Sequence, residues 1–110
     1  MDDSTSEFIL VQTTSGENTV LEKIARQLVM ERLAACVQIS GPLKSYFSWE
    51  GKIDSASEWL CSIKTTRQAW RRVEQTIVEL HNYGLPEIIV LPIIDGSTAY
   101  LEWVRENVSD

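Results

Sequence analysis

RLAACVQISGPLKSYFSWEGKIDSASEWLCSIK, the stretch from Arg32 to Lys64, decides the fold of this chain. Two arms rich in apolar and aromatic residues meet at Trp49-Glu50-Gly51-Lys52, so the stretch predicts one long β-hairpin. An arm of about 12 residues at roughly 3.3 Å per residue is on the order of 40 Å long. A compact domain of this length has a radius of gyration of only about 13 Å. We therefore expect the hairpin to extend beyond its own domain.

The outer half of the predicted hairpin is rich in aromatic residues: Tyr46, Phe47, Trp49 and Trp59. Aromatic side chains bury roughly 150–250 Å² each, and four in water would form an apolar patch larger than the few hundred Å² that monomers usually expose. We therefore expect another copy of the chain to cover them, which makes the protein an obligate homo-oligomer.

Composition and charge narrow the class of protein. The chain has 110 residues, of which 44% are hydrophobic and 24% charged, as in a soluble single domain. Its net charge of −6 argues against nucleic-acid binding, which needs a basic face. No apolar run approaches the ~20 residues that span a bilayer, so no membrane association is expected. The polar, acidic N-terminus does not resemble a signal peptide, and we expect a cytosolic protein.

Hydrophobic spacing places the remaining elements on both sides of the hairpin. The pairs Thr19/Glu22 and Thr65/Gln68 have capping-box spacing before apolar helical patterns. The first and last strands are continuously apolar, as in strands buried on both faces, and Pro92 marks the end of the last strand or an unpaired edge. The expected elements are a strand at 7–14, a helix at 19–33, the hairpin, a helix at 65–81, a strand at 87–94 and a helix at 98–107.

This order predicts the fold class and the domain boundaries. A β-α-β-β-α-β order is that of the α+β ferredoxin-like sandwich, here with an extra C-terminal helix. The wide apolar arc of that last helix suggests that it packs on its own sheet and on a neighbouring subunit. Residues 1–6 are expected to be a disordered tail, and residues 7–110 a single domain.

A bulge is expected at Gly41-Pro42. Val37 and Ile39 on the first arm, and Trp59, Cys61 and Ile63 on the second, are all odd-numbered. A turn centred between Glu50 and Gly51 pairs odd residues with even ones, so the apolar faces match only if one residue is skipped. Proline cannot donate to a strand ladder, and glycine in a strand often marks a bulge.

Cys36 and Cys61 are the two cysteines, and both lie in apolar strand contexts. In a reducing compartment they are best interpreted as small buried hydrophobic residues. A disulfide, or a metal or redox role, is the alternative.

Several motifs together resemble the CutA divalent-cation tolerance family: RLAACVQI, YFSWEGKI, IKTT, YGLPEIIVLPI and YLEW. The resemblance covers the chain from about Phe8 to Val104. It implies ferredoxin-like subunits in a tight homotrimer, similar to the PII signalling proteins, with the long hairpins embracing adjacent subunits. It also implies a role in tolerance to copper and other divalent metals, without a required cofactor.

The family's copper-ligand pattern implies three positions in this sequence. They are a cysteine ending the first strand, a histidine ending the second helix and a glutamate opening the next strand. Here the first position is Gln12 and the second is Leu80, with His81 next to it, while Glu87 matches. The metal ligands expected from the resemblance are therefore Glu87 and His81. A lone histidine at a helix C-terminus is, however, also favoured by the helix dipole alone.

A cleft between subunits is the second expected site. Lys64 ends a strand just before a helix start, and beside Glu87 it would pair with that carboxylate or bind a small anionic ligand with helix N–H groups. The other residues expected to line the cleft are Trp49, Glu50, Tyr83, Tyr100 and Trp103. Interface packing explains the aromatic residues equally well, and turn geometry explains Glu50.

No signature of an enzyme is present. The sequence has no GxSxG, Walker or GxGxxG motif, and its single histidine has no matching nucleophile. We therefore expect a non-enzymatic, trimeric metal-tolerance protein that acts by weak metal binding or by regulation. The alternative is a PII-like signalling module that recognises a small anionic metabolite and a protein partner.

Overall fold

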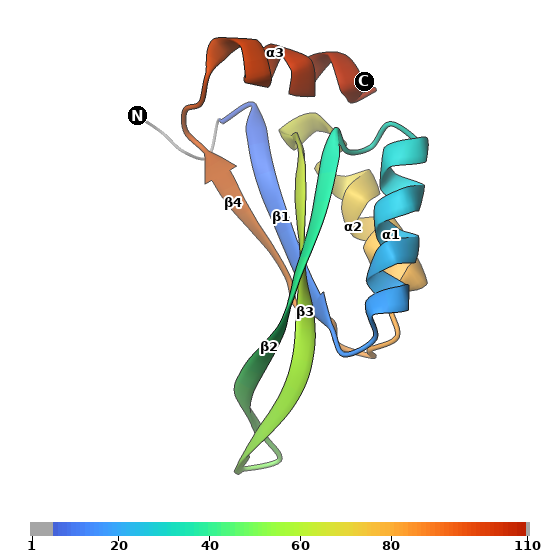
Figure 1. Ribbon diagram of the computed structural model, residues 1–110, viewed down its shortest axis with the longest axis vertical. Coiled ribbons are helices and arrows are strands. Elements are labelled where there is room, and N and C mark those ends of the chain that lie inside the picture. The colour runs from blue at the N-terminus through green and yellow to red at the C-terminus, as the bar shows by residue number, and fades with distance from the viewer. Residues whose placement is uncertain (1–5, 110) are drawn as a thin grey trace.

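The computed structural model describes residues 6–109 and has four strands and three α-helices in this part of the chain. Their order confirms the expected ferredoxin-like topology with a C-terminal helix (Figure 1). The elements are β1 (Phe8–Ser15), α1 (Asn18–Met30), β2 (Cys36–Trp49), β3 (Lys52–Thr66), the short 3-10 turn η2 (Arg67–Ala69), α2 (Trp70–Leu80), β4 (Ile88–Ile93) and α3 (Thr98–Asn107).

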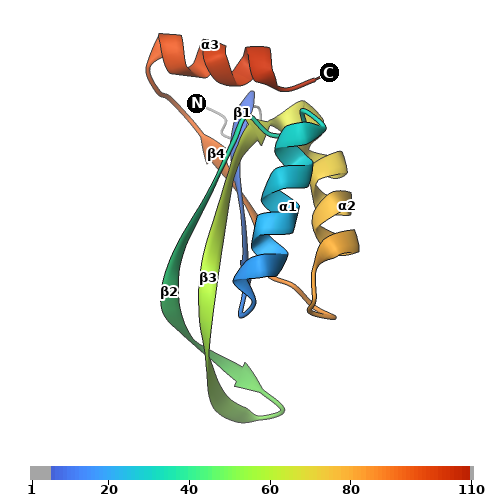
Figure 2. The same cartoon turned by 45° about the vertical axis from the view of Figure 1, so that its right-hand side comes forward.

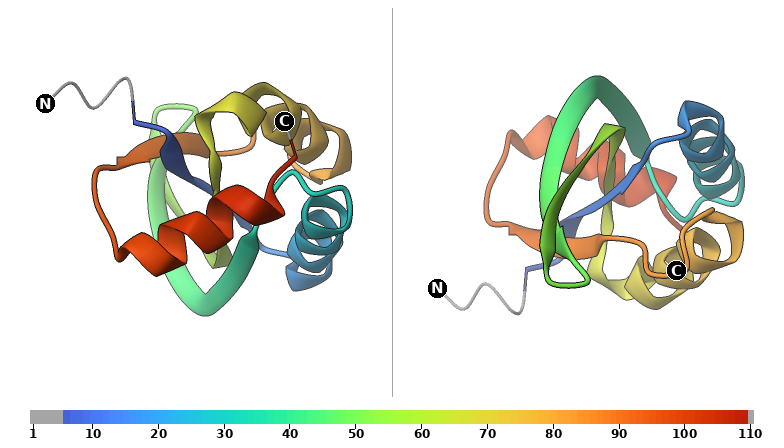
Figure 3. Two further views of the ribbon diagram at one scale, coloured as in Figure 1. Left: turned by 90° about the horizontal axis from the view of Figure 1, so that it is seen from above. Right: turned by 90° about the horizontal axis from the view of Figure 1, so that it is seen from below.

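The four strands form one antiparallel sheet in the order β2-β3-β1-β4. Helices α1 and α2 cover one face of this sheet, and α3 lies across its end (Figures 1 and 3). The core lies between the two helices and the sheet, because the apolar side chains of both helices point inward. Its fully buried members include Ile9, Val11, Leu21, Ile24, Leu28, Ile63, Val73 and Ile77.

The β2–β3 hairpin extends well past the helices and the other two strands (Figure 2). The molecule measures 44 × 32 × 22 Å with a radius of gyration of 14.6 Å, above the ~13 Å of a compact domain of this length. Tyr46, Phe47 and Trp49 are exposed, as expected. Trp59 is instead half-buried against the core, because it lies at the inner end of the projecting segment.

The predicted bulge is confirmed. Trp49 pairs with Lys52 at the tip, and the register shifts between Ser40 and Leu43. Between the bulge and the base of the hairpin, odd-numbered residues pair with odd-numbered residues; Ile39, for example, pairs with Cys61. Gly41 has a φ of 139°, and a Cβ there would lie 3.0 Å from the Trp59 ring, so the bulge requires glycine.

Two helix starts differ from the expected ones. No side chain caps α1 at Glu17, so the Thr19/Glu22 box is wrong. Thr65 belongs to β3, where its hydroxyl donates to the Leu33 carbonyl at 2.6 Å, and it therefore cannot cap the second helix. The Thr65 hydroxyl is therefore used in a tertiary hydrogen bond and not in the helix cap that the local sequence pattern predicted.

Two further predictions were wrong, the end of the first helix and the burial of the last strand. Helix α1 ends at Met30, because Arg32 adopts a φ of 58° and turns the chain out of the helix. Strand β4 is an edge strand, which agrees with Pro92 as a sign of an unpaired edge. Its predicted burial on both faces is wrong, because Ile89 and Leu91 are exposed on the face that α1 and α2 do not cover. Of the tail expected at 1–6, only Ser6 lies within the described residues, and its carbonyl accepts a hydrogen bond from Arg67 Nε at 2.8 Å.

Candidate functional site

A groove of about 890 Å³ separates the outer hairpin from the segment Asn82–Glu87 that joins α2 to β4. The hairpin supplies one wall because its outer half projects beyond the sheet, and the short segment after α2 supplies the other. The lining residues are Thr14, Ser45, Tyr46, Phe47, Trp49, Asp54, Ala56, Glu58, Asn82, Tyr83, Gly84, Leu85, Pro86 and Glu87.

Tyr83 connects the two walls of the groove. Its hydroxyl donates to Oε2 of Glu58 at 2.8 Å and accepts a hydrogen bond from the Gly16 amide at 2.8 Å. Burial raises the pKa of Tyr83, and the hydrogen bond to Glu58 raises it further, so the phenol remains a donor. A Cβ at position 16 would lie 3.3 Å from this hydroxyl, so glycine permits the close approach.

His81 ends α2, as the sequence predicted, and its ring is fully engaged. Nδ1 accepts from the Tyr83 amide at 3.0 Å, and Nε2 lies 2.8 Å from the Thr14 carbonyl. Because an amide donates and a carbonyl only accepts, this pairing places the ring proton on Nε2. The histidine therefore fixes the start of the 82–87 segment against β1, and a metal would have to displace one of these partners.

The residues that the family pattern assigns to copper do not form a metal site within the subunit. Leu80 packs against the core, Gln12 lies within β1, and Glu87 is exposed on the groove. Among residues 6–109, no three His, Cys, Asp or Glu side chains are grouped so that they could hold a metal ion. A resident copper site built from one subunit does not fit these side chains.

The expected cleft residues fall into two groups at different levels of the sheet. Trp49, Tyr83 and Glu87 line the groove. Lys64, in contrast, pairs with Leu10 of β1. Ile88, the residue after Glu87, pairs with Thr13 of β1. Lys64 and Ile88 therefore lie three residues apart along β1.

Lys64 lies with the two other aromatic residues beside α3. Its ammonium donates to Gln38 Oε1 at 2.9 Å and lies 5.7 Å from the ring centroid of Tyr100. Tyr100 in turn packs beside Trp103, with 5.5 Å between ring centroids. A single subunit therefore does not bring Lys64 next to Glu87.

Glu50 occupies the tip of the hairpin outside the groove lining. Glu50 and Gly51 have φ values of 50° and 77°, the left-handed pair that a two-residue type I′ turn requires. The structure thus gives Glu50 a role in the turn.

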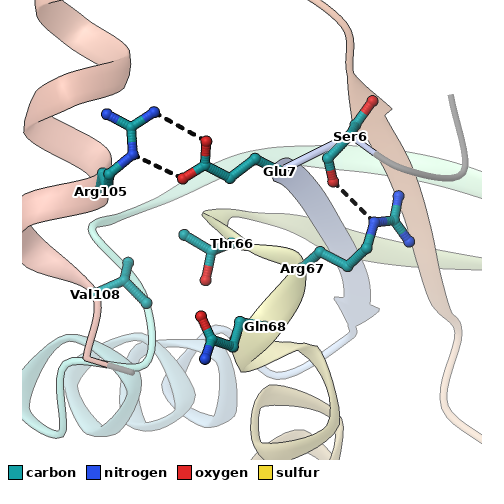
Figure 4. A pocket seen from close by; sticks show the side chains of 7 residues that line it. All are labelled: Ser6, Glu7, Thr66, Arg67, Gln68, Arg105 and Val108. Carbon is teal, nitrogen blue, oxygen red and sulfur yellow. Dashed lines mark hydrogen bonds and ion pairs between the residues drawn. The ribbon is translucent and has the colours of Figure 1, made fainter.

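A second, smaller hollow of about 260 Å³ lies between the residues just before β1, the end of β3 with η2, and the C-terminal part of the chain around α3 (Figure 4). Arg105 donates to both oxygens of Glu7 at 2.7 and 2.9 Å, and Arg67 donates to the Ser6 carbonyl at 2.8 Å. Arg105 also pairs with Glu102 on α3. This cluster ties the C-terminal helix to the first strand.

Sequence analysis missed Glu58 and Asp54, which line the groove with Glu87. Glu58 is 7% exposed, although glutamate is rarely buried without a partner. The signal was present in the hairpin register, because even-numbered residues of β3 beyond the bulge share a face with Phe47. The partner Tyr83, which explains the burial, comes from a loop 25 positions away.

Comparison with known proteins gives a match over nearly the whole chain. The family model described as CutA1 divalent ion tolerance protein matches residues 9–107. The divalent-cation tolerance protein CutA of Thermus thermophilus is 43% identical over 101 residues, which cover 92% of this chain and 96% of that protein.

Solved structures agree with the sequence match. The divalent cation tolerance protein (Cut A1) of Thermus thermophilus superimposes with a TM-score of 0.90 at 40% identity, over 93% of this chain and 99% of that one. A protein of Archaeoglobus fulgidus, described as a periplasmic divalent cation tolerance protein CutA, superimposes with a TM-score of 0.89 at 35% identity, over 93% and 99% of the two chains.

Proposed function

This chain belongs to the CutA1 divalent ion tolerance family, and from that premise we propose that it is a non-enzymatic, cytosolic homotrimer that acts in tolerance to copper and other divalent metals. The observation that carries the proposal is the family match over residues 9–107. The tolerance role is that of the family, whereas the trimer, the copper ligand and the cytosolic location are the parts that need experiments.

Exposed apolar surface on the hairpin supports assembly into a trimer. Tyr46 is 72% exposed and Ile53 is 87% exposed, and they project from the same face of the hairpin. On the face of the sheet away from α1 and α2, Ile89 and Leu91 of β4 are exposed as well. Burying such surface against sister chains is favourable by roughly 25 cal/mol per Å² of apolar area.

Light scattering on the purified protein tests the assembly. We expect a mass three times the 12.5 kDa of the chain. Ile53→Lys should weaken the trimer, because it places a charge in the covered surface. Gln75→Lys, at an exposed position on α2, is the control. A stable, folded monomer of the unmodified protein would contradict the proposal.

Copper binding by this chain is proposed to be weak and to involve Glu87. Thiolate and imidazole ligands select copper, and here Gln12 and Leu80 stand at those two positions while both nitrogens of His81 are hydrogen-bonded. We expect calorimetric titration with CuCl₂ to give a dissociation constant on the order of 0.1–1 mM. Glu87→Gln should abolish it, and Glu79→Gln, a change on the outer surface of α2, should not.

Growth in added metal tests the role itself. A strain that lacks its own member of this family should regain growth in copper-containing medium when it expresses this chain. Failure to restore growth at normal expression would remove the tolerance role. Separate titrations with other divalent cations would then show whether binding persists without that role.

The cytosolic part of the proposal is supported by the two free thiols, Cys36 and Cys61, which a reducing compartment maintains. No helix in the described part of the chain is long and apolar enough to cross a membrane. Fractionation of cells that express the chain should recover it with cytosolic markers, and recovery with periplasmic or organellar markers would overturn this location.

The signalling alternative with an anionic metabolite has no support at the groove. The described residues that line it include three carboxylates and no lysine, arginine or histidine. An anion bound there would be repelled by Asp54, Glu58 and Glu87.

A further inference from the structure

The short connection between β4 and α3 contains an aspartate followed by a glycine, Asp95-Gly96. In Figure 1 it is the turn through which the chain leaves β4 and enters α3. Residues 94–97 belong to neither element, and Asp95, Gly96 and Ser97 are exposed. The backbone of such a connection is freer to rotate than that of a strand or helix.

The Gly96 amide lies against the carboxylate of the residue before it. Its N–H donates to Oδ1 of Asp95, with 2.8 Å between nitrogen and oxygen. The carboxyl carbon is bonded to that oxygen, so the amide nitrogen lies beside the carbon that it would attack to close a five-membered ring. Reacting atoms held roughly 3–3.5 Å apart favour an intramolecular step. Because glycine has no Cβ, no side chain on residue 96 hinders this approach.

A second aspartate offers a comparison within the same chain. The Ser55 amide donates to Oδ1 of Asp54 at 2.7 Å, which is as close as the contact at Asp95. Asp54 and Ser55 lie within β3, however, where they pair with Phe47 and Tyr46 of β2. Ring closure there would disturb the strand pairing, and the Ser55 side chain would crowd the attacking nitrogen. The two contacts are equally close, and only the one at Asp95 lies in a connection outside the sheet.

We propose that Asp95-Gly96 is a site of spontaneous covalent modification, at which aspartate converts to isoaspartate through a succinimide. The Gly96 nitrogen attacks Cγ of the protonated Asp95 carboxyl group. A C–N bond forms, a C–O bond breaks, and the amide proton leaves with the hydroxyl group as water. Water then adds to the original main-chain carbonyl carbon and opens the ring, so that the main chain passes through Cγ. This proposal does not depend on the role in metal tolerance.

The modification would act on the start of α3. Ser97 caps this helix, since its Oγ accepts from the Tyr100 amide at 3.2 Å. The other end of the helix is held, because Arg105 donates to both oxygens of Glu7. Isoaspartate adds one carbon to the main chain just before the cap. The longer connection therefore meets a helix that is fixed at its far end, and we expect the Ser97 cap to be lost.

Assembly should leave this reaction unhindered. Residues 95–98 are Asp-Gly-Ser-Thr, and they add no large apolar side chain to the surface that we expect sister chains to cover. Ring closure is intramolecular and ring opening needs only water, so no partner molecule has to reach the site. The test therefore uses the intact oligomer, in which a buried turn would be recognised by the lack of product.

The experiment incubates the intact oligomer for several weeks at physiological temperature and neutral pH. Digestion after glutamate residues gives the fragments 51–58 and 88–102, which contain Asp54 and Asp95. Electron-transfer fragmentation in a mass spectrometer distinguishes isoaspartate from aspartate, although their masses are equal. We expect isoaspartate to accumulate in fragment 88–102 and to be at least about tenfold lower in fragment 51–58.

Two comparisons test the chemistry and the fold separately. Gly96→Ala should slow the conversion about tenfold, because the new Cβ hinders the attack. That Cβ would lie 3.4–3.5 Å from the Leu101 side chain, an ordinary contact, so the variant should fold. A synthetic peptide of residues 94–102 gives the rate without the fold, and the rate in the native protein should lie within about tenfold of it.

Asp95→Asn should convert about tenfold faster, because an amide loses ammonia more readily than a carboxylate loses water. Hydrogen exchange of the Tyr100 amide should be faster in the isoaspartyl protein, since its cap is lost. The proposal is overturned by equal isoaspartate in the two fragments, by a native rate more than about tenfold below that of the peptide, or by an unchanged rate in Gly96→Ala. Unchanged exchange at Tyr100 in the modified protein would overturn the effect on α3.

Discussion

The hydroxyl of Tyr83 donates a 2.8 Å hydrogen bond to Oε2 of Glu58, which joins the loop after α2 to the long hairpin. The same hydroxyl accepts from the Gly16 amide, so one side chain holds three separate segments together. The hairpin therefore has a fixed orientation at its base even though its outer half projects into solvent.

Tyr83→Phe should lower the free energy of unfolding by about 1.5–3 kcal/mol, since it leaves a buried carboxylate and a backbone amide without their partner. Urea unfolding at one fixed protein concentration is the measurement, because the stability of an oligomer depends on concentration. Glu79→Gln, an exposed change on α2 outside the hairpin, is the control and should change stability by less than about 0.5 kcal/mol. Equal effects of the two variants would show that the Glu58 contact is not stabilising.

Gly41→Ala should destabilise the protein by about 1–3 kcal/mol, because alanine rarely adopts such a φ value. The new Cβ would also lie 3.0 Å from the Trp59 ring and 3.2 Å from the Glu58 carbonyl. Thermal unfolding is the measurement. Gly84→Ala is the control, since a Cβ at that position meets nothing within 4 Å. A Gly41→Ala protein as stable as the control would mean that the bulge relaxes freely.

Cys61 should resist thiol reagents in the native protein. Burial raises the pKa of its thiol to about 12, so very little thiolate is present near neutral pH. Mass spectrometry after brief treatment with iodoacetamide should find Cys61 unmodified, and labelling should appear when urea unfolds the chain. Native labelling of Cys61 at the rate of the unfolded chain would contradict the burial.

The pairing of Glu7 with Arg105 should make part of the stability depend on pH. The Arg105 hydrogen bond is the main cause that holds the pKa of Glu7 below its ordinary value of 4.5. The folded state therefore favours the charged carboxylate, and its contribution is complete above pH 4.5 and is lost as the pH falls through the lowered pKa.

Comparing the unmodified protein with Glu7→Gln from pH 7 to pH 3 tests this directly. The unfolding midpoint of the variant should be slightly lower at neutral pH, since the pair is half exposed and strongly screened. The two midpoints should converge toward the acid end. If the difference between the two midpoints grew as the pH fell, the charged Glu7–Arg105 pair would not be the source of the pH-dependent stability.

Much of the fold followed from the sequence alone. The element order, the hairpin tip at Glu50-Gly51 and the bulge at Gly41-Pro42 follow from local chemistry and from the period of two in a strand. The apolar residues of both arms are odd-numbered, and this alone requires one unpaired residue in the hairpin, whatever the rest of the chain does. The final helix, Thr98–Asn107, has the predicted bounds because Ser97 caps it locally.

Tertiary structure decided the rest. Thr65 bonds to the Leu33 carbonyl instead of capping a helix, and one face of β4 is exposed although its sequence is as apolar as that of β1. The groove depends on Tyr83 reaching Glu58, and the sheet register keeps Lys64 away from Glu87 within one subunit. Local sequence fixes how each segment turns and which residues share a face. Which faces pack together depends on contacts between residues that are distant along the chain. These contacts form only when the strands are paired, so their free energies cannot be read from the local sequence.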